Sequence, residues 1–179
     1  MFEGWGEYYL LVGGASGALI GLLFVVVTLT SGVERSRAQR GAVLYITPTV
    51  FHFATVLTLS GVALAPHLPA ILVAVILAAG GVYGLAYAGF ILIGIRRPSV
   101  PEPPHWTDPW CYALFPGVAY LVLVAAGVTA WRALACAPFV LAVATMLLLL
   151  VAIRNAWDLV TWLAPRAAEA SPPDAAPDA

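Results

Sequence analysis

Five long apolar runs, separated by short segments rich in charge, proline or glycine, dominate the sequence. They cover about residues 8–29, 42–65, 69–95, 112–131 and 137–155. Each run is close to the roughly 20 residues that a helix needs to cross the hydrocarbon of a bilayer. None alternates polar and apolar residues as a strand of a membrane β-barrel does. The pattern therefore predicts an all-α, polytopic transmembrane helix bundle of five spans, with four or six spans as the alternatives.

The arginine residues predict how this bundle is oriented. Cytoplasmic loops of membrane proteins carry an excess of basic residues. With five spans, one side of the membrane holds Arg35, Arg37, Arg40, Arg96, Arg97, Arg154 and Arg166, and the other side holds Arg132 alone. We therefore expect the N-terminus outside and the C-terminus in the cytoplasm. Residues 1–164 form the predicted bundle, and residues 165–179, rich in Ala, Pro and Asp, form a predicted disordered tail.

The composition fits the same class of protein. The chain is 62% hydrophobic and only 9% charged, whereas about a quarter of the residues in a soluble domain are charged. A net charge of −1 argues against a nucleic-acid partner and leaves the lipid bilayer as the expected surroundings. The many alanines and arginines and the absence of lysine suit the cytoplasmic (inner) membrane of a bacterium.

The second run carries a polar stripe inside an otherwise apolar segment. At 100° per residue, Tyr45, Pro48, Thr49, His52 and Thr55 fall within about 120° of one another. His52 lies near the middle of its run, and an ionisable group at that depth is by default a candidate functional residue. The alternative is a neutral histidine that holds two helices together through a hydrogen bond.

Other polar residues have a similar predicted depth. The predicted polar layer, a candidate transport site, consists of His52, Thr49, Thr55, Tyr45, Ser16, Tyr83, Tyr87 and Thr145. These side chains could converge on one polar cavity, either within a subunit or between subunits. Channels and transporters keep their binding groups in such a layer.

Small residues and a proline-rich loop indicate contacts with other helices or proteins. The first run repeats glycine every four residues at Gly13, Gly17 and Gly21, and the third run has Gly80 and Gly84. Such ridges favour close helix packing, within one subunit or across a homo-oligomer seam. The loop at residues 98–110 contains five prolines and could bind a membrane-protein partner. Arg154 and Asp158 are one helical turn apart and are predicted to form an anchor at the inner interface.

Two resemblances add to this interpretation. The segment Gly14-Ala-Ser-Gly-Ala18 resembles the serine motif of rhomboid intramembrane proteases, which implies a serine–histidine pair made by Ser16 and His52. The same segment continued to Val25, together with Arg154-Asn-Ala-Trp-Asp-Leu-Val160, is similar to uncharacterised small bacterial inner-membrane proteins. No asparagine or second histidine lies near His52 in the sequence to hold an oxyanion. We therefore predict no enzyme, no catalytic residue, no metal and no cofactor.

The sequence leaves two functions open besides proteolysis. The first is a small channel or transporter for protons, ions or a small solute, with its site around His52. The alternative is a non-enzymatic accessory or scaffold subunit of a membrane complex. A transporter needs a hydrated cavity at the depth of His52, whereas an accessory subunit can have a dry, packed interior and an exposed small-residue groove.

Overall fold

The protein is a bundle of long helices in which five helices are long and apolar enough to cross a membrane. The computed structural model describes residues 2–29, 46–96 and 107–170, and within these ranges all regular structure is helical. The helices are α1 (Gly6–Leu29), α3 (Thr47–Leu64), α4 (Ala70–Ile95), the π-helix η2 (Trp110–Leu114), α5 (Phe115–Trp131) and α6 (Ala137–Ala170). The π-helix η2 leads directly into α5, and the two together form the fourth span. The predicted helical class and five candidate spans are confirmed.

The helix ends differ from the predicted ends in two informative places. Helix α3 begins at Thr47, so Pro48 lies in its first turn, where a missing backbone N–H costs no helical hydrogen bond. Pro48 therefore does not interrupt the span. Helix α6 continues to Ala170, beyond the predicted start of the tail at residue 165. The alanines in this stretch favour helix, which explains the extension. Residues 171–179 lie outside the described part of the chain.

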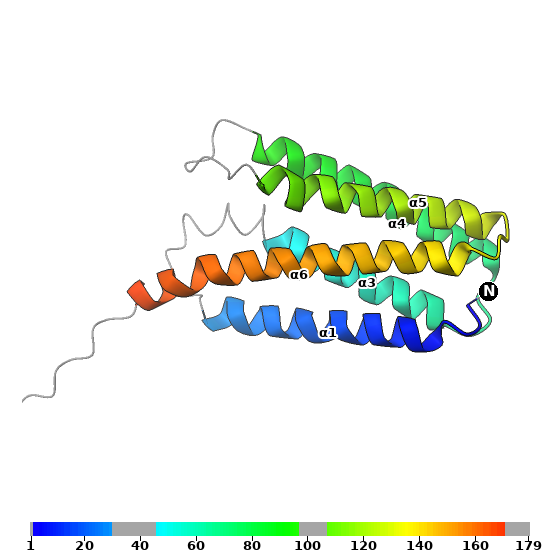
Figure 1. Ribbon diagram of the computed structural model, residues 1–179, viewed down its shortest axis with the longest axis horizontal. Helices are drawn as coiled ribbons and strands as arrows, with labels where there is room; N and C mark the ends of the chain where they lie inside the picture. The colour runs from blue at the N-terminus through cyan, green and yellow to red at the C-terminus, as the bar shows by residue number, and fades with distance from the viewer. Residues whose placement is uncertain (1, 30–45, 97–106, 171–179) are drawn as a thin grey trace, which may run out of the picture.

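The helices form two pairs with α6 between them. Helix α1 packs along α3, helix α4 packs along α5, and α6 contacts α1, α3 and α5. Figure 1 shows the α4–α5 pair above α6 and the α1–α3 pair below it. Although α3 and α4 are joined by a short loop, they belong to different pairs and make few contacts with each other. Any group that joins α3 to α5 therefore joins the two halves of the bundle.

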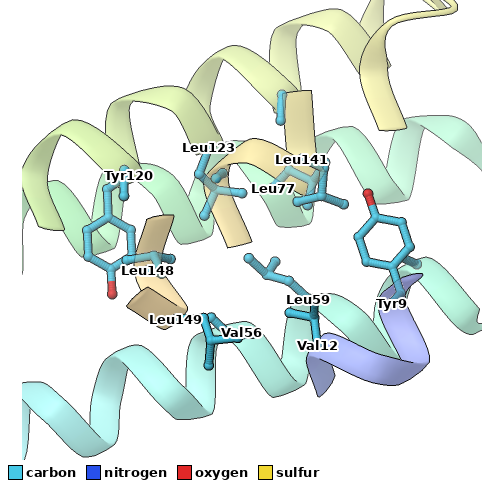
Figure 2. Packing of buried hydrophobic residues seen from close by; sticks show 14 of the residues in the cluster. Tyr9, Val12, Val56, Leu59, Leu77, Tyr120, Leu123, Leu141, Leu148 and Leu149 are labelled. Atoms are coloured by element: carbon cyan, nitrogen blue, oxygen red, sulfur yellow. The ribbon is translucent and has the colours of Figure 1, made fainter. Parts of the chain in front are cut away.

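An apolar core runs along α6 and receives side chains from every span (Figure 2). Fully or almost fully buried members come from α1 (Val12), α3 (Val56), α4 (Leu77), α5 (Leu123) and α6 (Leu148). Many other large apolar side chains point outward, such as Leu11 (70% exposed) and Trp157 (71% exposed). A soluble protein rarely exposes contiguous apolar surface on this scale, whereas lipid solvates it.

Glycines allow α4 and α5 to pack closely against each other. A Cβ atom added at Gly81 would lie 2.8 Å from the backbone nitrogen of Val124, and one at Gly127 would lie 2.8 Å from that of Ala78. A Cβ atom at Gly84 would overlap the ring of Tyr120. Glycine at these positions lets the two backbones approach, which is how membrane helices gain packing energy.

Only some glycines of the predicted ridges lie in close contacts between helices. A Cβ atom at Gly13 would lie 2.8 Å from the Cβ atom of Ser60, so Gly13 belongs to the contact between α1 and α3. Gly17 and Gly80 have ordinary contacts, each with one leucine at 3.9 Å. Gly21 is exposed, and a Cβ atom there would meet nothing within 4 Å. Gly13 and Gly84 thus pack helices within one chain.

We predict that Gly84→Ala destabilises the bundle, because the added methyl group collides with the Tyr120 ring. Overpacking of this kind typically costs about 1–3 kcal/mol. The measurement is thermal unfolding of the purified protein in detergent. Gly89→Ala is the matched control, since a Cβ atom at Gly89 on the same helix meets nothing within 4 Å. Equal unfolding temperatures for the two variants would contradict this account of the α4–α5 contact.

Candidate functional site

The imidazole of His52 lies at the junction between the two helix pairs. Its Nδ1 atom is 2.7 Å from the hydroxyl oxygen of Tyr120, which comes from α5. The His52 side chain is 1% exposed and that of Tyr120 is fully buried. In Figure 2 the Tyr120 ring points from α5 toward α3, with its oxygen at the far end. This hydrogen bond therefore connects the α1–α3 pair to the α4–α5 pair.

Two features of the sequence place the Tyr120 phenol there. Gly84 on α4 has no side chain, and the Tyr120 ring occupies the space that a side chain would fill. Phe51, next to His52, packs against the rings of Tyr87 and Tyr120, with centroids 4.7 Å and 6.1 Å away respectively. The aromatic rings fix the direction of the phenol, so that its hydroxyl meets the imidazole.

The second nitrogen of the His52 ring is buried without a partner. Within the described residues, no hydrogen-bonding group reaches Nε2. If the Tyr120 hydroxyl donates to Nδ1, then Nε2 carries the proton and is an unused donor; if Nδ1–H donates to the phenol, Nε2 is an unused acceptor. Leaving a buried polar atom unpaired typically costs about 1–3 kcal/mol. Packing alone does not explain why a histidine occupies this position.

Several other residues of the predicted polar layer have their hydrogen bonds elsewhere. The Ser16 hydroxyl donates to the carbonyl of Phe53 at 2.7 Å, which ties α1 to α3. The hydroxyl of Thr145 donates to carbonyls of its own helix. The Thr55 hydroxyl donates to the Phe51 carbonyl of its own helix, but it also shares a side-chain hydrogen bond with Tyr120. The hydroxyls of Ser16 and Thr145 therefore serve helix structure and packing, whereas Thr55 lies at the junction of His52 and Tyr120.

The remaining predicted residues have different surroundings. Thr49 is fully buried, whereas Tyr83 is 63% exposed and its ring makes a T-shaped contact with that of Phe51. Tyr87 is partly buried against the same phenylalanine. Tyr45 lies outside the described residues. The tyrosines gather beside the His52–Tyr120 junction, so the structure brings only part of the predicted layer together.

The serine–histidine pair implied by the protease-like segment is not joined in the described structure. The Ser16 hydroxyl donates its hydrogen bond to the Phe53 carbonyl, and the His52 Nδ1 atom is hydrogen-bonded to the Tyr120 hydroxyl. A nucleophilic serine needs its hydroxyl within hydrogen-bond reach of the base. The geometry of Ser16 is that of a packing residue in a membrane helix.

A second buried polar cluster lies between η2 and α6, at the end of the bundle where the fourth span begins. The Asn155 side chain is fully buried and donates from Nδ2 to the carbonyl of Cys111 at 3.0 Å. It accepts at Oδ1 from Nη1 of Arg154 at 3.3 Å. The Tyr112 hydroxyl donates to Oδ2 of Asp158 at 3.2 Å. The cluster thus holds the start of the fourth span against the fifth.

The predicted anchor of Arg154 and Asp158 is the exposed rim of this cluster. Their closest charged atoms are 3.7 Å apart, and both side chains are more than 40% exposed. An exposed pair of this kind is worth little, typically 0–1 kcal/mol. The buried amide of Asn155, rather than the ion pair, is therefore the group whose removal leaves unsatisfied atoms.

The π-helix explains why an asparagine is needed at this point. In η2 the N–H of Phe115 donates to the carbonyl of Trp110, one residue beyond the α-helical partner. The carbonyl of Cys111 would next receive the N–H of residue 116, but Pro116 has none. Asn155 supplies the missing donor from α6. The extra residue in the π-turn and the proline after it thus leave the Cys111 carbonyl without a donor from its own helix, and the side-chain amide of Asn155 replaces that donor.

Sequence reasoning missed Tyr120, Tyr112 and Asn155 as partners. All three are polar residues inside or at the edge of apolar runs, and this position in the sequence could have identified them as candidates. Their hydrogen-bond partners are visible only in the structure. In the ranges that the structure describes, no group of three or more His, Cys, Asp and Glu side chains could share a metal ion. Both cysteines are free; Cys111 is buried and Cys136 is exposed.

We predict that Asn155→Ala destabilises the protein by about 1–3 kcal/mol, because the Cys111 carbonyl loses its donor in an apolar interior. The measurement is equilibrium unfolding in mixed detergent micelles. In the double variant with Pro116→Ala, a backbone N–H becomes available again, so the added cost of removing Asn155 should shrink to less than half. Strictly additive losses in this double-mutant cycle would disprove the proposed link between Pro116 and Asn155.

The chain was compared with protein-family models, with curated proteins and with solved structures. No family model, curated protein or solved structure matches it.

Proposed function

We propose that the protein is a non-enzymatic accessory subunit of a larger membrane complex and contains no transport path of its own. The observation that carries this proposal is the sealed state of His52, which is 1% exposed at the junction of the two helix pairs. Ser16 and Thr145, at neighbouring depths, are fully buried and bonded to backbone carbonyls. Polar side chains used in this way act as glue between and within helices.

The outward face of α1 offers a surface for another transmembrane helix. Gly14, Ala18 and Gly21 are all exposed and recur at helical spacing. A Cβ atom at Gly14 or Gly21 would meet nothing within 4 Å, in contrast to Gly13 on the packed face. Small residues that face lipid allow the backbone of a partner helix to approach closely. We infer that this face contacts a helix of the complex, or of a second copy in a homo-oligomer.

We infer that the protein resides in a bacterial cytoplasmic membrane, with its N-terminus outside. Arg96 and Arg154 lie at one end of the bundle and Arg132 at the other. The end with Arg132 also holds the start of α1, since the Tyr9 hydroxyl donates to the carbonyl of Pro138 at 2.7 Å. Three further arginines, Arg35, Arg37 and Arg40, lie outside the described residues, as does most of the proline-rich loop at 98–110.

Site-specific photocrosslinking in native membranes tests this function. A photoreactive amino acid at Ala18 should give a discrete protein crosslink, whereas the same amino acid at Ala125, an exposed position on α5, should not. Gly14→Leu together with Gly21→Leu should lower the Ala18 crosslink at least fivefold, because the added side chains keep the partner backbone away. Equal crosslinking at Ala18 and Ala125, or no effect of the leucines, would overturn the proposal.

Transport of protons, ions or a small solute is the second candidate, and the unpaired Nε2 atom of His52 favours it. An imidazole can take and release a proton near neutral pH. The His52 side chain is 1% exposed, so transport through this site would need a movement of the helices that exposes Nε2.

Proton flux into liposomes that contain the purified protein and a pH-sensitive dye tests this candidate. A transporter should show flux that His52→Leu lowers at least tenfold. Thr145→Val serves as the control, because this hydroxyl bonds only to its own helix in the described structure. Flux no greater than in empty liposomes, or unchanged flux in His52→Leu, would remove proton transport through this site.

A further inference from the structure

The buried hydrogen bond between His52 and Tyr120 belongs to a longer series of polar contacts. The Tyr120 hydroxyl also shares a side-chain hydrogen bond with Thr55, which lies about one turn after His52 on α3. The Thr55 hydroxyl in turn donates to the carbonyl of Phe51 at 2.8 Å. Contacts therefore run in series from the imidazole Nδ1 to the phenol, from the phenol to the threonine, and from the threonine to a backbone carbonyl.

The number of protons in this series decides how the imidazole is protonated. Each of the two hydroxyls carries one proton, and a neutral imidazole carries one proton on either of its nitrogens. With that proton on Nδ1, His52 donates to Tyr120, Tyr120 donates to Thr55, and the Thr55 donation to Phe51 is kept. Every contact is then a hydrogen bond. With the proton on Nε2, the two hydroxyl protons must serve all the contacts of the series, and one contact loses its hydrogen bond.

The polar atom left without a partner also differs between the two arrangements. Nε2 of His52 is buried and has no hydrogen-bond partner among the described residues. With the proton on Nδ1, Nε2 is a bare acceptor, whereas with the proton on Nε2 it is a buried N–H group without an acceptor. Among backbone groups, an unpaired buried N–H is rarer than an under-used acceptor. The extra hydrogen bond and the kind of unpaired atom therefore both favour the proton on Nδ1.

We infer that the neutral imidazole of His52 is held with its proton on Nδ1 and presents Nε2 to the bundle interior as an unprotonated nitrogen. Thr55 is a positioning residue, because its oxygen accepts the Tyr120 proton that Nδ1 would otherwise receive. Nε2 therefore takes a proton, or accepts a hydrogen bond from an O–H or N–H group, and donates to nothing. A proton added at Nε2 leaves the donation from Nδ1 to Tyr120 in place. This state of His52 is independent of the function proposed above.

Solid-state NMR of the full-length protein in lipid bilayers, with nitrogen-15 in its histidines, tests the proposal. The changes His67→Asn and His105→Gln leave His52 as the only histidine. Asparagine suits position 67, where φ is 57°. Nε2 is identified by its couplings to both carbon-bound ring protons. At neutral pH we expect a directly bonded proton on Nδ1 and none on Nε2. A proton on Nε2, alone or together with one on Nδ1, would overturn the proposal.

Threonine variants measured in the same way test the role of Thr55. In Thr55→Val the Tyr120 phenol loses its acceptor. Because a phenol is a stronger acid than a neutral imidazole, it should then donate to Nδ1, and the Nδ1–H signal should be lost in favour of Nε2–H. Thr55→Ser keeps the hydroxyl and should keep the Nδ1–H signal.

Thr145→Val is the matched control, since it makes the same change at a buried threonine of α6 that bonds only to its own helix in the described structure. This variant should keep the Nδ1–H signal. An unchanged Nδ1–H signal in Thr55→Val, or its loss in Thr55→Ser or Thr145→Val, would overturn the role assigned to Thr55.

Discussion

The hydrogen bond between His52 and Tyr120 joins two pairs of helices whose backbones meet mainly through α6. Its geometry depends on Gly84, because the phenol reaches α3 only by lying in the space that a side chain at position 84 would occupy. Lipid is as apolar as a leucine, so hydrophobic burial does little to choose between partners inside a bilayer. In this bundle, close backbone contacts at glycines and a few hydrogen bonds determine which helices pack together.

Backbone groups also fix a helix contact at the end of the bundle where the fourth span begins. A π-turn followed by Pro116 leaves the Cys111 carbonyl without a donor from its own helix, and Asn155 on α6 provides one. In an apolar medium an unsatisfied carbonyl costs more than it does at a wet surface. The local irregularity of η2 therefore fixes the contact between the fourth and fifth spans. The exposed ion pair of Arg154 and Asp158 adds little to it.

The buried polar groups of this protein are of two kinds: those whose hydrogen bonds stabilise the fold, and those with an atom that has no partner among the described residues. Ser16, Thr145 and Asn155 are buried and bonded, whereas the Nε2 atom of His52 is buried and unbonded. The bonded groups are those expected of the packed accessory subunit that we propose, and Nε2 is the atom that the second candidate, transport, would use.

The sequence by itself determined the class of the fold and the positions of its helices. Hydropathy over runs of about 20 residues reports burial in lipid directly, and it located all five candidate spans. Outside the polar stripe of the second run, it could not determine which face of each helix points inward, because the other helices are apolar on nearly every side. Whether Gly13, Gly14 or Gly21 faces a neighbour, and whether His52 meets water or Tyr120, depends on contacts between residues far apart in the chain. Those contacts are set by side-chain shape and by a few hydrogen bonds, so only the tertiary structure decided them.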